Sequence, residues 1–169
     1  MIHVYTGNGK GKTTSAIGLS IRTAGYGKKV LFTQFVKDME YSEIKILKTI
    51  LNIEYKRYGK GCFISRDPDD EDIQLIKNGL KEIKDLIEKN DYMLVVLDEV
   101  NIALKYNLLT LEDLKFFFNI YKDNLNKDLV LTGRYAPEEL IEIADLVTEM
   151  KEIKHYFNDG ILARDGIER

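Results

Sequence analysis

Short apolar runs alternate along this chain with stretches whose apolar residues recur at helical spacing. The clearest run, residues 92–97, is apolar throughout, so it predicts a strand buried on both faces of a sheet. On either side of it, apolar residues spaced three and four apart predict amphipathic helices at 73–87 and 111–125. Parallel strands need a crossover connection, and a helix usually supplies it. The pattern therefore predicts an α/β fold, a mainly parallel sheet sandwiched by helices.

The remaining elements continue the same alternation. Further strands are predicted at 2–5, 30–35, 53–58, 129–132 and 146–150, and further helices at 12–24, 42–51 and 137–144. An acidic run, residues 67–72, precedes one helix. Its simpler interpretation is a helix cap at Asp69 or Asp70, and the alternative is a metal or partner site. With 169 residues, two prolines and no Ser/Gly-rich stretch, the chain is expected to form one domain, 1–169.

Composition excludes several classes of function. The chain holds 25 Lys and Arg against 28 Asp and Glu, a net charge of −3, which gives no basic surface for nucleic acid or an anionic membrane. No apolar run reaches the roughly 18 residues of a membrane span, and the N-terminus lacks the segments of a signal peptide. The single cysteine excludes an intrachain disulfide. We therefore expect a cytoplasmic protein that binds neither nucleic acid nor membrane.

A glycine-rich loop follows the first predicted strand and leads into a helix. Residues 6–14 read TGNGKGKTT, which matches the end of the pattern G-x-x-x-x-G-K-[ST], with Thr6 in place of the opening glycine. Glycines let successive backbone N–H groups turn toward one anion, and the helix N-terminus adds its own free N–H groups. Lys12 would place a positive charge among phosphates, and the Thr13 hydroxyl is a suitable ligand for Mg²⁺. The sequence thus predicts a phosphate-binding loop in a P-loop NTPase-like (RecA-like) fold.

Two acidic residues, Asp98 and Glu99, follow the most apolar strand. Ligands of open α/β sheets bind beside the carboxyl ends of the strands, so one carboxylate would hold Mg²⁺ and the other would orient a reacting group. The alternative is a helix cap after a buried strand. Arg134 follows another strand and either reaches the same phosphates or lies at the surface of a turn. Arg22, ten residues after Lys12, is more often a surface cation than a ligand.

Further stretches form an ordered set along the chain with this loop. They are QFVK at 34–37, LDE at 97–99, LTGRYAP at 131–137, ADLVTEM at 144–150, KH at 154–155 and GILARDGIE at 160–168. The set resembles the ATP:corrinoid adenosyltransferases of the CobA/BtuR type, in which Thr6 of the loop is also typical. The resemblance implies transfer of the 5′-deoxyadenosyl group of ATP to the Co(I) centre of cobalamin or cobinamide. Triphosphate is then released, and the role is biosynthesis or salvage of adenosylcobalamin.

The resemblance also implies roles for single residues. Lys12, Glu99 and Asp98 form the catalytic set, with Lys12 the main cation on the triphosphate. Thr13 and Glu99 are the implied ligands of Mg²⁺, and Asp98 supports them. The residues implied to contact the nucleotide are Gly7, Asn8, Gly9, Lys10, Gly11, Lys12, Thr13, Thr14, Arg22 and Arg134.

The corrinoid side of the site departs from the family pattern. Members displace the lower axial ligand of the corrinoid with aromatic side chains from a Gly-Phe-x-Trp stretch, to which residues 61–64 (GCFI) correspond. Because this chain has no tryptophan, the task is assigned to Phe63 or Tyr58. The resemblance further implies a flavoprotein reductant and a homodimer.

Two other classes of function remain open from the residues alone. One is a small-molecule kinase or RecA-like ATPase, and the other is a non-catalytic nucleotide-binding module. The product separates them, because the first would release ADP or phosphate and the second nothing, whereas an adenosyltransferase releases triphosphate.

Overall fold

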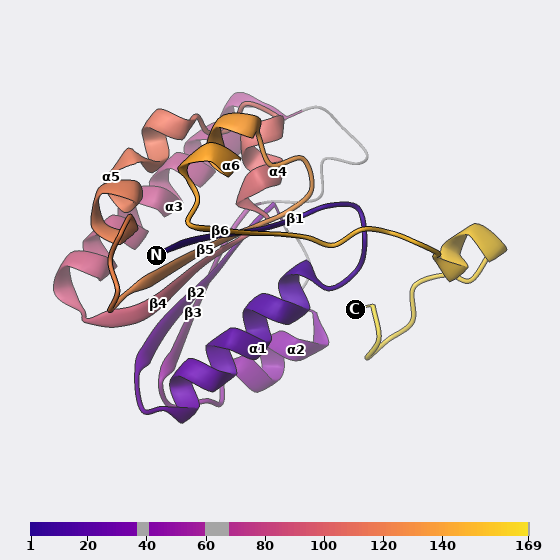
Figure 1. Ribbon diagram of the computed structural model, residues 1–169, viewed down its shortest axis with the longest axis horizontal. Coiled ribbons are helices and arrows are strands. Elements are labelled where there is room, and N and C mark those ends of the chain that lie inside the picture. Colours follow the sequence, from indigo (N-terminus) through magenta and orange to yellow (C-terminus); the bar gives the residue numbers. More distant parts are fainter. Residues whose placement is uncertain (37–40, 60–67, 169) are drawn as a thin grey trace.

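One six-stranded sheet organises the molecule (Figure 1). The computed structural model describes residues 1–36, 41–59 and 68–168. The strands are β1 (Ile2–Thr6), β2 (Lys29–Phe35), β3 (Ile53–Tyr58), β4 (Tyr92–Asp98), β5 (Asp128–Thr132) and β6 (Leu146–Glu149). They lie in the order β3-β2-β4-β5-β1-β6, and every neighbouring pair is parallel. The predicted α/β class with a parallel sheet is confirmed.

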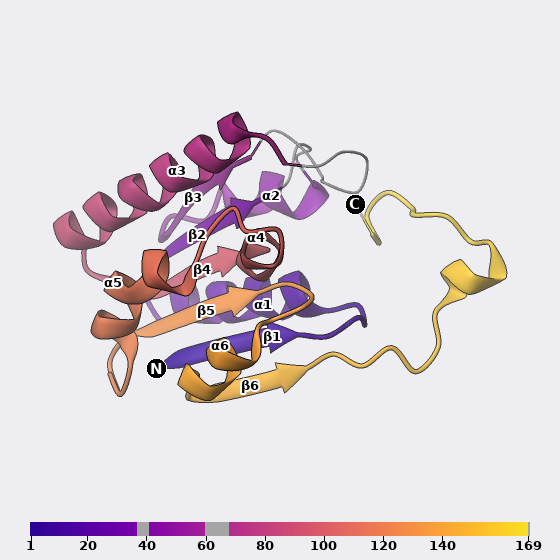
Figure 2. The same cartoon turned by 90° about the horizontal axis from the view of Figure 1, so that it is seen from above.

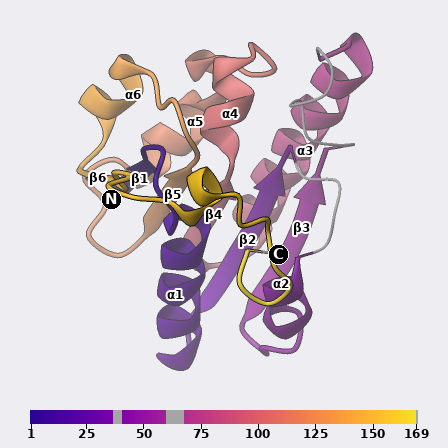
Figure 3. The same ribbon diagram turned by 90° about the vertical axis from the view of Figure 1, so that its right-hand side faces the viewer.

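Helices cover both faces of this sheet. They are α1 (Lys12–Gly25), α2 (Ser42–Leu47), α3 (Asp70–Lys89), α4 (Val100–Lys105), α5 (Leu111–Tyr121) and α6 (Glu138–Ile143). A 3-10 helix, η1 (Tyr156–Asp159), lies away from the sheet in the segment after β6. Viewed toward one end of the strands, α1 and α2 lie below the sheet and α3 to α6 above it (Figure 3). Side chains alternate between two cores, as β4 illustrates: Leu94 and Val96 pack toward α1, whereas Val95 and Leu97 pack toward the opposite layer. A strand apolar throughout therefore lies at the centre of the sheet, as its sequence predicted.

The acidic run before α3 forms a helix cap. The Asp69 carboxylate accepts a hydrogen bond from the Asp72 N–H at 2.9 Å, and the Asp72 carboxylate accepts one from the Asp69 N–H at 3.0 Å. This reciprocal capping box satisfies two N–H groups that a helix start otherwise leaves without partners. The simpler of the two interpretations is thus confirmed, with Asp69 as the cap.

Two helices end earlier than their spacing predicted. The helix expected at 42–51 ends at Leu47, and Leu51 is 97% exposed, because the chain turns there into β3. The helix expected at 111–125 ends at Tyr121, since Lys122 already has an extended backbone, and Leu125 is 85% exposed. The spacing of apolar residues does not indicate the residue at which the backbone stops being helical. The short helix α4 and the 3-10 helix had no counterpart among the predicted elements.

After β6 the chain leaves the sheet. Residues 151–168, called here the C-terminal arm, project beyond the carboxyl ends of the strands and curve back (Figure 2). Within the described ranges, no helix has the length and apolar character needed to cross a membrane.

Candidate functional site

The glycine-rich loop joins β1 to α1 and packs against the segment that follows β6. The Gly9 N–H donates to the Met150 carbonyl at 2.6 Å. A Cβ built on Gly7 would lie 2.5 Å from that carbonyl oxygen, and one on Gly9 would lie 2.7 Å from it. Gly7 and Gly11 also have φ of +97° and +121°, a region that side chains disfavour. Glycine is therefore required by both the curl of the loop and its close packing.

Lys12 begins α1 and bends back over the loop. Its Nζ donates to the carbonyls of Gly7 at 2.8 Å and Gly9 at 2.7 Å, and its side chain is buried. Burial lowers the pKa of Lys12, while the Glu99 carboxylate opposes this change and the charge of Arg134 adds to it. The ammonium thus lies inside the curl, where the loop's own carbonyls supply its partners.

Asp98, at the end of β4, is fully buried and holds three neighbouring side chains. Its Oδ1 accepts from Thr13 Oγ1 at 2.9 Å and from Thr132 Oγ1 at 2.6 Å, and its Oδ2 accepts from Gln34 Nε2 at 2.9 Å. Tyr55 donates in turn to the Gln34 amide oxygen at 2.9 Å. One carboxylate therefore ties the first turn of α1 to β2, β4 and β5.

Glu99, the next residue, has its side chain at the cavity, whereas Asp98 is fully buried. Its φ of +61° places it in the left-handed region, which is uncommon for a residue other than glycine and concentrates at functional sites. Its N–H donates to Thr132 Oγ1 at 3.0 Å, and its side chain lines a cavity beside Arg134. The Thr13 hydroxyl and the two carboxylates offer oxygen atoms of the kind that Mg²⁺ binds, so this donor set fits the metal.

The cavity in front of the loop has a volume of about 900 Å³, within the range of ligand sites. One end is lined by the loop, with Thr13, Glu99 and Arg134. Much of the rest is lined by apolar and aromatic side chains, with Ser42 and Glu43 among them: Ile17, Val36, Tyr41, Ile46, Ile102, Tyr106 and Tyr135. The C-terminal arm contributes His155 and residues 166–168. The loop end carries the cations Lys12 and Arg134 and the remainder is mainly apolar, which suits a ligand whose anionic groups lie at one end.

The structure brings together most of the residues singled out from the sequence, with three exceptions. Arg22 is exposed in the last turn of α1, ten residues or about 15 Å of helix from Lys12, and does not line the cavity. Tyr58 is buried with its ring 5.8 Å from that of Phe35, away from the cavity. Phe63 lies outside the described residues. Arg22 and Tyr58 therefore do not reach the site in this conformation.

The Thr13 hydroxyl donates to Asp98, the residue expected to support the Mg²⁺ ligands Thr13 and Glu99. One placed residue differs from expectation. Lys10 points away from the loop interior and toward the C-terminal arm, with its Nζ 2.8 Å from the Ile167 carbonyl.

Sequence reasoning did not single out Gln34, Thr132, His155 or Glu168 as site residues. Gln34 and Thr132 bind the Asp98 carboxylate from two other strands, and the other two line the cavity from the arm. All four lie in the stretches that carry the family resemblance, and Gln34 and Thr132 also lie near the carboxyl ends of parallel strands, which meet at one edge of the sheet.

Comparisons with known proteins agree with this architecture. The family model for ATP:corrinoid adenosyltransferase BtuR/CobO/CobP matches residues 1–169. A corrinoid adenosyltransferase of Sinorhizobium sp is 35% identical over 99% of this chain and 79% of its own length. One of Pseudomonas aeruginosa is 37% identical, covering 98% and 81%, and one of Escherichia coli K12 is 30% identical, covering 99% and 85%.

Solved structures show the fold alone. A KaiC-like protein of Pyrococcus horikoshii has a TM-score of 0.54 at 18% identity, covering 99% of this chain and 74% of that one. The cytoplasmic domain of EssC has a TM-score of 0.52 at 18% identity, covering 96% and 33%. The predicted P-loop NTPase-like fold is thereby confirmed. On the match over residues 1–169 and on relatives at this level of identity, the chain belongs to the ATP:corrinoid adenosyltransferase family BtuR/CobO/CobP.

Proposed function

We propose that this protein transfers the 5′-deoxyadenosyl group of ATP to the Co(I) centre of cobalamin or cobinamide and releases triphosphate. The observation that carries the proposal is the phosphate loop with Lys12 buried in its curl, beside Asp98 and Glu99 at the carboxyl edge of the sheet. Membership of the adenosyltransferase family supports the choice of this reaction over phosphoryl transfer.

The reaction needs a stabilised leaving group more than a protein nucleophile. An electron pair of Co(I) forms the bond to C5′ of the ribose, and the C5′–O bond breaks with its pair on the departing triphosphate. No proton has to be abstracted. Charge accumulates on the triphosphate, where the loop N–H groups, the α1 N-terminus and Lys12 stabilise it. ATP therefore uses this loop with its triphosphate as the leaving group.

Mg²⁺ completes the proposed site. Thr13 and Glu99 would hold it, with Asp98 orienting the Thr13 hydroxyl through their 2.9 Å hydrogen bond. When bound, the metal supplies positive charge against the triphosphate. Arg134, whose charge lowers the pKa of Lys12, would contact the same phosphates from the side.

The proposal extends to partners and location. A flavoprotein would supply the electron that brings the corrinoid to Co(I), and the enzyme would act as a homodimer in the cytoplasm. An exposed edge strand supports the dimer, because β6 pairs with β1 and leaves Leu146 and Val147 42% and 41% exposed. Light scattering of the purified protein tests the dimer.

An anaerobic assay tests the reaction. The protein is mixed with chemically reduced cob(I)alamin, ATP and Mg²⁺, the corrinoid spectrum is followed, and the phosphate product is identified. We expect light-sensitive adenosylcobalamin with stoichiometric triphosphate, and the same with cobinamide if that is the preferred substrate. ADP or phosphate without cobalt alkylation would assign the protein to the kinases or ATPases.

The matched variant is Lys12→Ala, which removes the cation at the centre of the loop. We expect it to abolish nearly all turnover. Near-normal activity in this variant would refute the assignment of the loop.

A further inference from the structure

The C-terminal arm leaves the phosphate loop and returns to it. Directly before the arm, the Met150 carbonyl accepts a hydrogen bond from the Gly9 N–H at 2.6 Å. At its end, Ile167 and Glu168 contact the side chain of Lys10, the next loop residue. Gly9 and Lys10 are adjacent in the loop, so both ends of the arm are attached at the same place. Figure 2 shows the arm projecting between these points.

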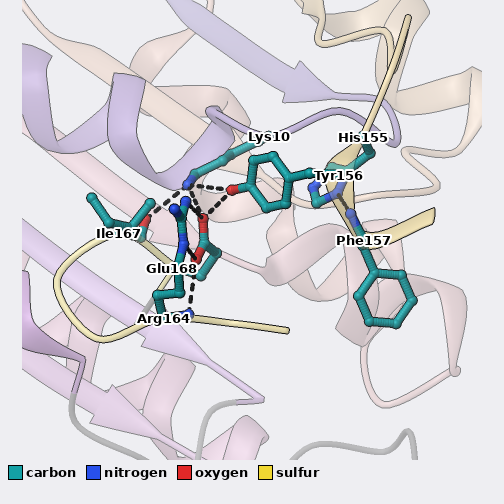
Figure 4. A network of polar contacts seen from close by, with 7 residues as sticks. All are labelled: Lys10, His155, Tyr156, Phe157, Arg164, Ile167 and Glu168. Carbon is teal, nitrogen blue, oxygen red and sulfur yellow. Dashed lines mark hydrogen bonds and ion pairs between the residues drawn. The ribbon is translucent and has the colours of Figure 1, made fainter. Parts of the chain in front are cut away.

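The second attachment is a network around one carboxylate (Figure 4). Lys10 Nζ donates to Glu168 Oε1 and to the Ile167 carbonyl, each at 2.8 Å. The Tyr156 hydroxyl donates to Glu168, and the Arg164 N–H donates to Glu168 Oε2 at 2.8 Å. The Arg164 guanidinium, the Lys10 ammonium and the Tyr156 hydroxyl hold the pKa of Glu168 well below its usual range. The carboxylate is charged at neutral pH, as an ordinary glutamate is, and the depressed pKa keeps it charged at more acidic pH as well.

The arm is also a wall of the cavity, since Gly166, Ile167 and Glu168 line it. The apolar side chain of Ile167, which is 55% exposed, belongs to the same cavity lining as Ile17 and Ile46. This part of the cavity suits the nucleoside of ATP rather than its phosphates. Two contacts of Lys10 hold this wall against the loop: the ion pair with Glu168 and the hydrogen bond to the Ile167 carbonyl.

We propose that Glu168 is a positioning residue for ATP: it pairs with Lys10, holds the end of the C-terminal arm against the phosphate loop, and so places Ile167 beside the adenosine. The inference rests on the proposed function, because it takes the loop as the site of the triphosphate. It assigns Lys10 to anchoring the arm, whereas Lys12 serves the phosphates. The adenosine and the triphosphate then depend on different lysines of one loop.

Steady-state kinetics with cob(I)alamin test this division. In Glu168→Gln and in Lys10→Met, we expect the KM for ATP to rise about two- to tenfold, the size of effect for a partly exposed charge pair, with kcat changed by less than about twofold. The conservative variant Lys10→Arg keeps a cation that can donate to both Glu168 and the Ile167 carbonyl, so its KM should stay within about twofold of the wild-type value.

Calorimetry distinguishes an anchor from a phosphate ligand. Glu168→Gln and Lys10→Met should weaken binding of Mg·ATP but leave binding of inorganic triphosphate with Mg²⁺ within about twofold, since triphosphate does not touch the arm wall. If Lys10 is a phosphate ligand, Lys10→Met weakens the binding of both Mg·ATP and triphosphate, and the proposal is overturned. Wild-type affinity for ATP in both single variants overturns it as well.

Controls come from the same arm. Lys151→Met and Glu152→Gln make the same charge changes at two exposed residues of the arm. Within the described part of the chain their side chains have no hydrogen bond or ion pair, so both variants should leave the KM for ATP unchanged. Trypsin should cut after Arg164 faster in Glu168→Gln than in the wild type, which shows the arm released in a folded protein. Lys12→Ala separates the two proposals: if it retains turnover, the proposed loop function fails whatever the arm does.

Discussion

Asp98 shows how one side chain orders the site. A fully buried carboxylate is tolerated only when its oxygens have hydrogen-bond donors, and here the donors are Thr13, Thr132 and Gln34, from three different elements. Glu99 follows it in the chain, but its left-handed backbone directs the side chain into the cavity. Two adjacent acids thus have different tasks, one holding the Thr13 hydroxyl and the other facing the ligand.

Neutralising each acid should separate these tasks. Glu99→Gln should raise the Mg²⁺ concentration needed for half-maximal activity roughly tenfold or more and leave the free energy of unfolding within about 0.5 kcal/mol of the wild-type value. Asp98→Asn turns an amide N–H₂ toward groups that already donate, so it should lower the free energy of unfolding by about 1–3 kcal/mol in addition to impairing activity. Mg²⁺ titration and urea unfolding of both variants provide the measurement. If the Mg²⁺ titration of Glu99→Gln equals that of the wild type, Asp98 and not Glu99 is the carboxylate that binds the metal.

Among the elements, α3 packs against β3 through a glycine. A Cβ on Gly79 would lie 2.5 Å from the Tyr58 ring, which is buried at the end of β3. Gly79→Ala gains about 1 kcal/mol of helix propensity, but the clash should outweigh it and lower the free energy of unfolding by about 1–3 kcal/mol.

The matched control is Gly18→Ala in α1, where nothing lies within 4 Å of the added methyl group. It gains the same propensity without the clash, so it should raise the free energy of unfolding by about 0.5–1 kcal/mol. Urea denaturation of the pair tests the packing directly. If both variants change the free energy of unfolding by the same amount, the Tyr58 ring moves aside and the clash costs nothing.

Asp145 joins the starts and ends of three elements. Its Oδ2 accepts from the Ile2 N–H at 2.7 Å, and its Oδ1 lies 2.6 Å from Lys122 Nζ, which also donates to the Ile143 carbonyl. Burial acts to raise the pKa of Asp145, but the Lys122 ammonium and the Ile2 N–H outweigh it and hold the pKa below its ordinary value.

A depressed carboxyl pKa fixes the sign of the pH dependence. The stabilisation from Asp145 is fully present above its unfolded pKa of about 4 and is lost as the pH falls through the lower folded value. Asp145→Asn should therefore be less stable than the wild type at neutral pH, and the difference should shrink below about pH 4. Urea unfolding at a series of acidic pH values measures it. A difference independent of pH would mean that the charge contributes nothing.

The sequence predicted the strands better than the helix ends, and the loop better than its surroundings. A strand such as β4 is buried on both faces, so its residues 92–97 are all apolar and the sequence alone identifies it. The end of α5 is set by the turn at Lys122, which spacing toward Leu125 concealed. The role of Glu168 was not predicted, because its partner Lys10 is remote along the chain and the residues do not indicate that the arm curves back to the loop.

For the whole molecule, the phosphate loop connects directly to much of the sheet. It continues β1, packs against the end of β6, and through Thr13 and Asp98 reaches β4, β5 and β2. We propose that residues 1–169 form one domain, because its strands share a single sheet between two cores. Calorimetric unfolding should then show one transition.

Inorganic triphosphate should shift that whole transition. A ligand that binds only the folded state at one hundred times its Kd adds about 2.7 kcal/mol, which for a chain of this size raises Tm by roughly 5–10 °C. Scanning calorimetry with triphosphate and Mg²⁺ measures the shift, and an equal concentration of inorganic phosphate is the control. Lys12→Ala should lose the shift, and Glu168→Gln should keep it, because the two residues serve different ends of ATP. If the protein unfolds in two transitions and triphosphate raises the temperature of only one, the chain consists of two folding units. The phosphate loop then belongs to the unit that triphosphate stabilises.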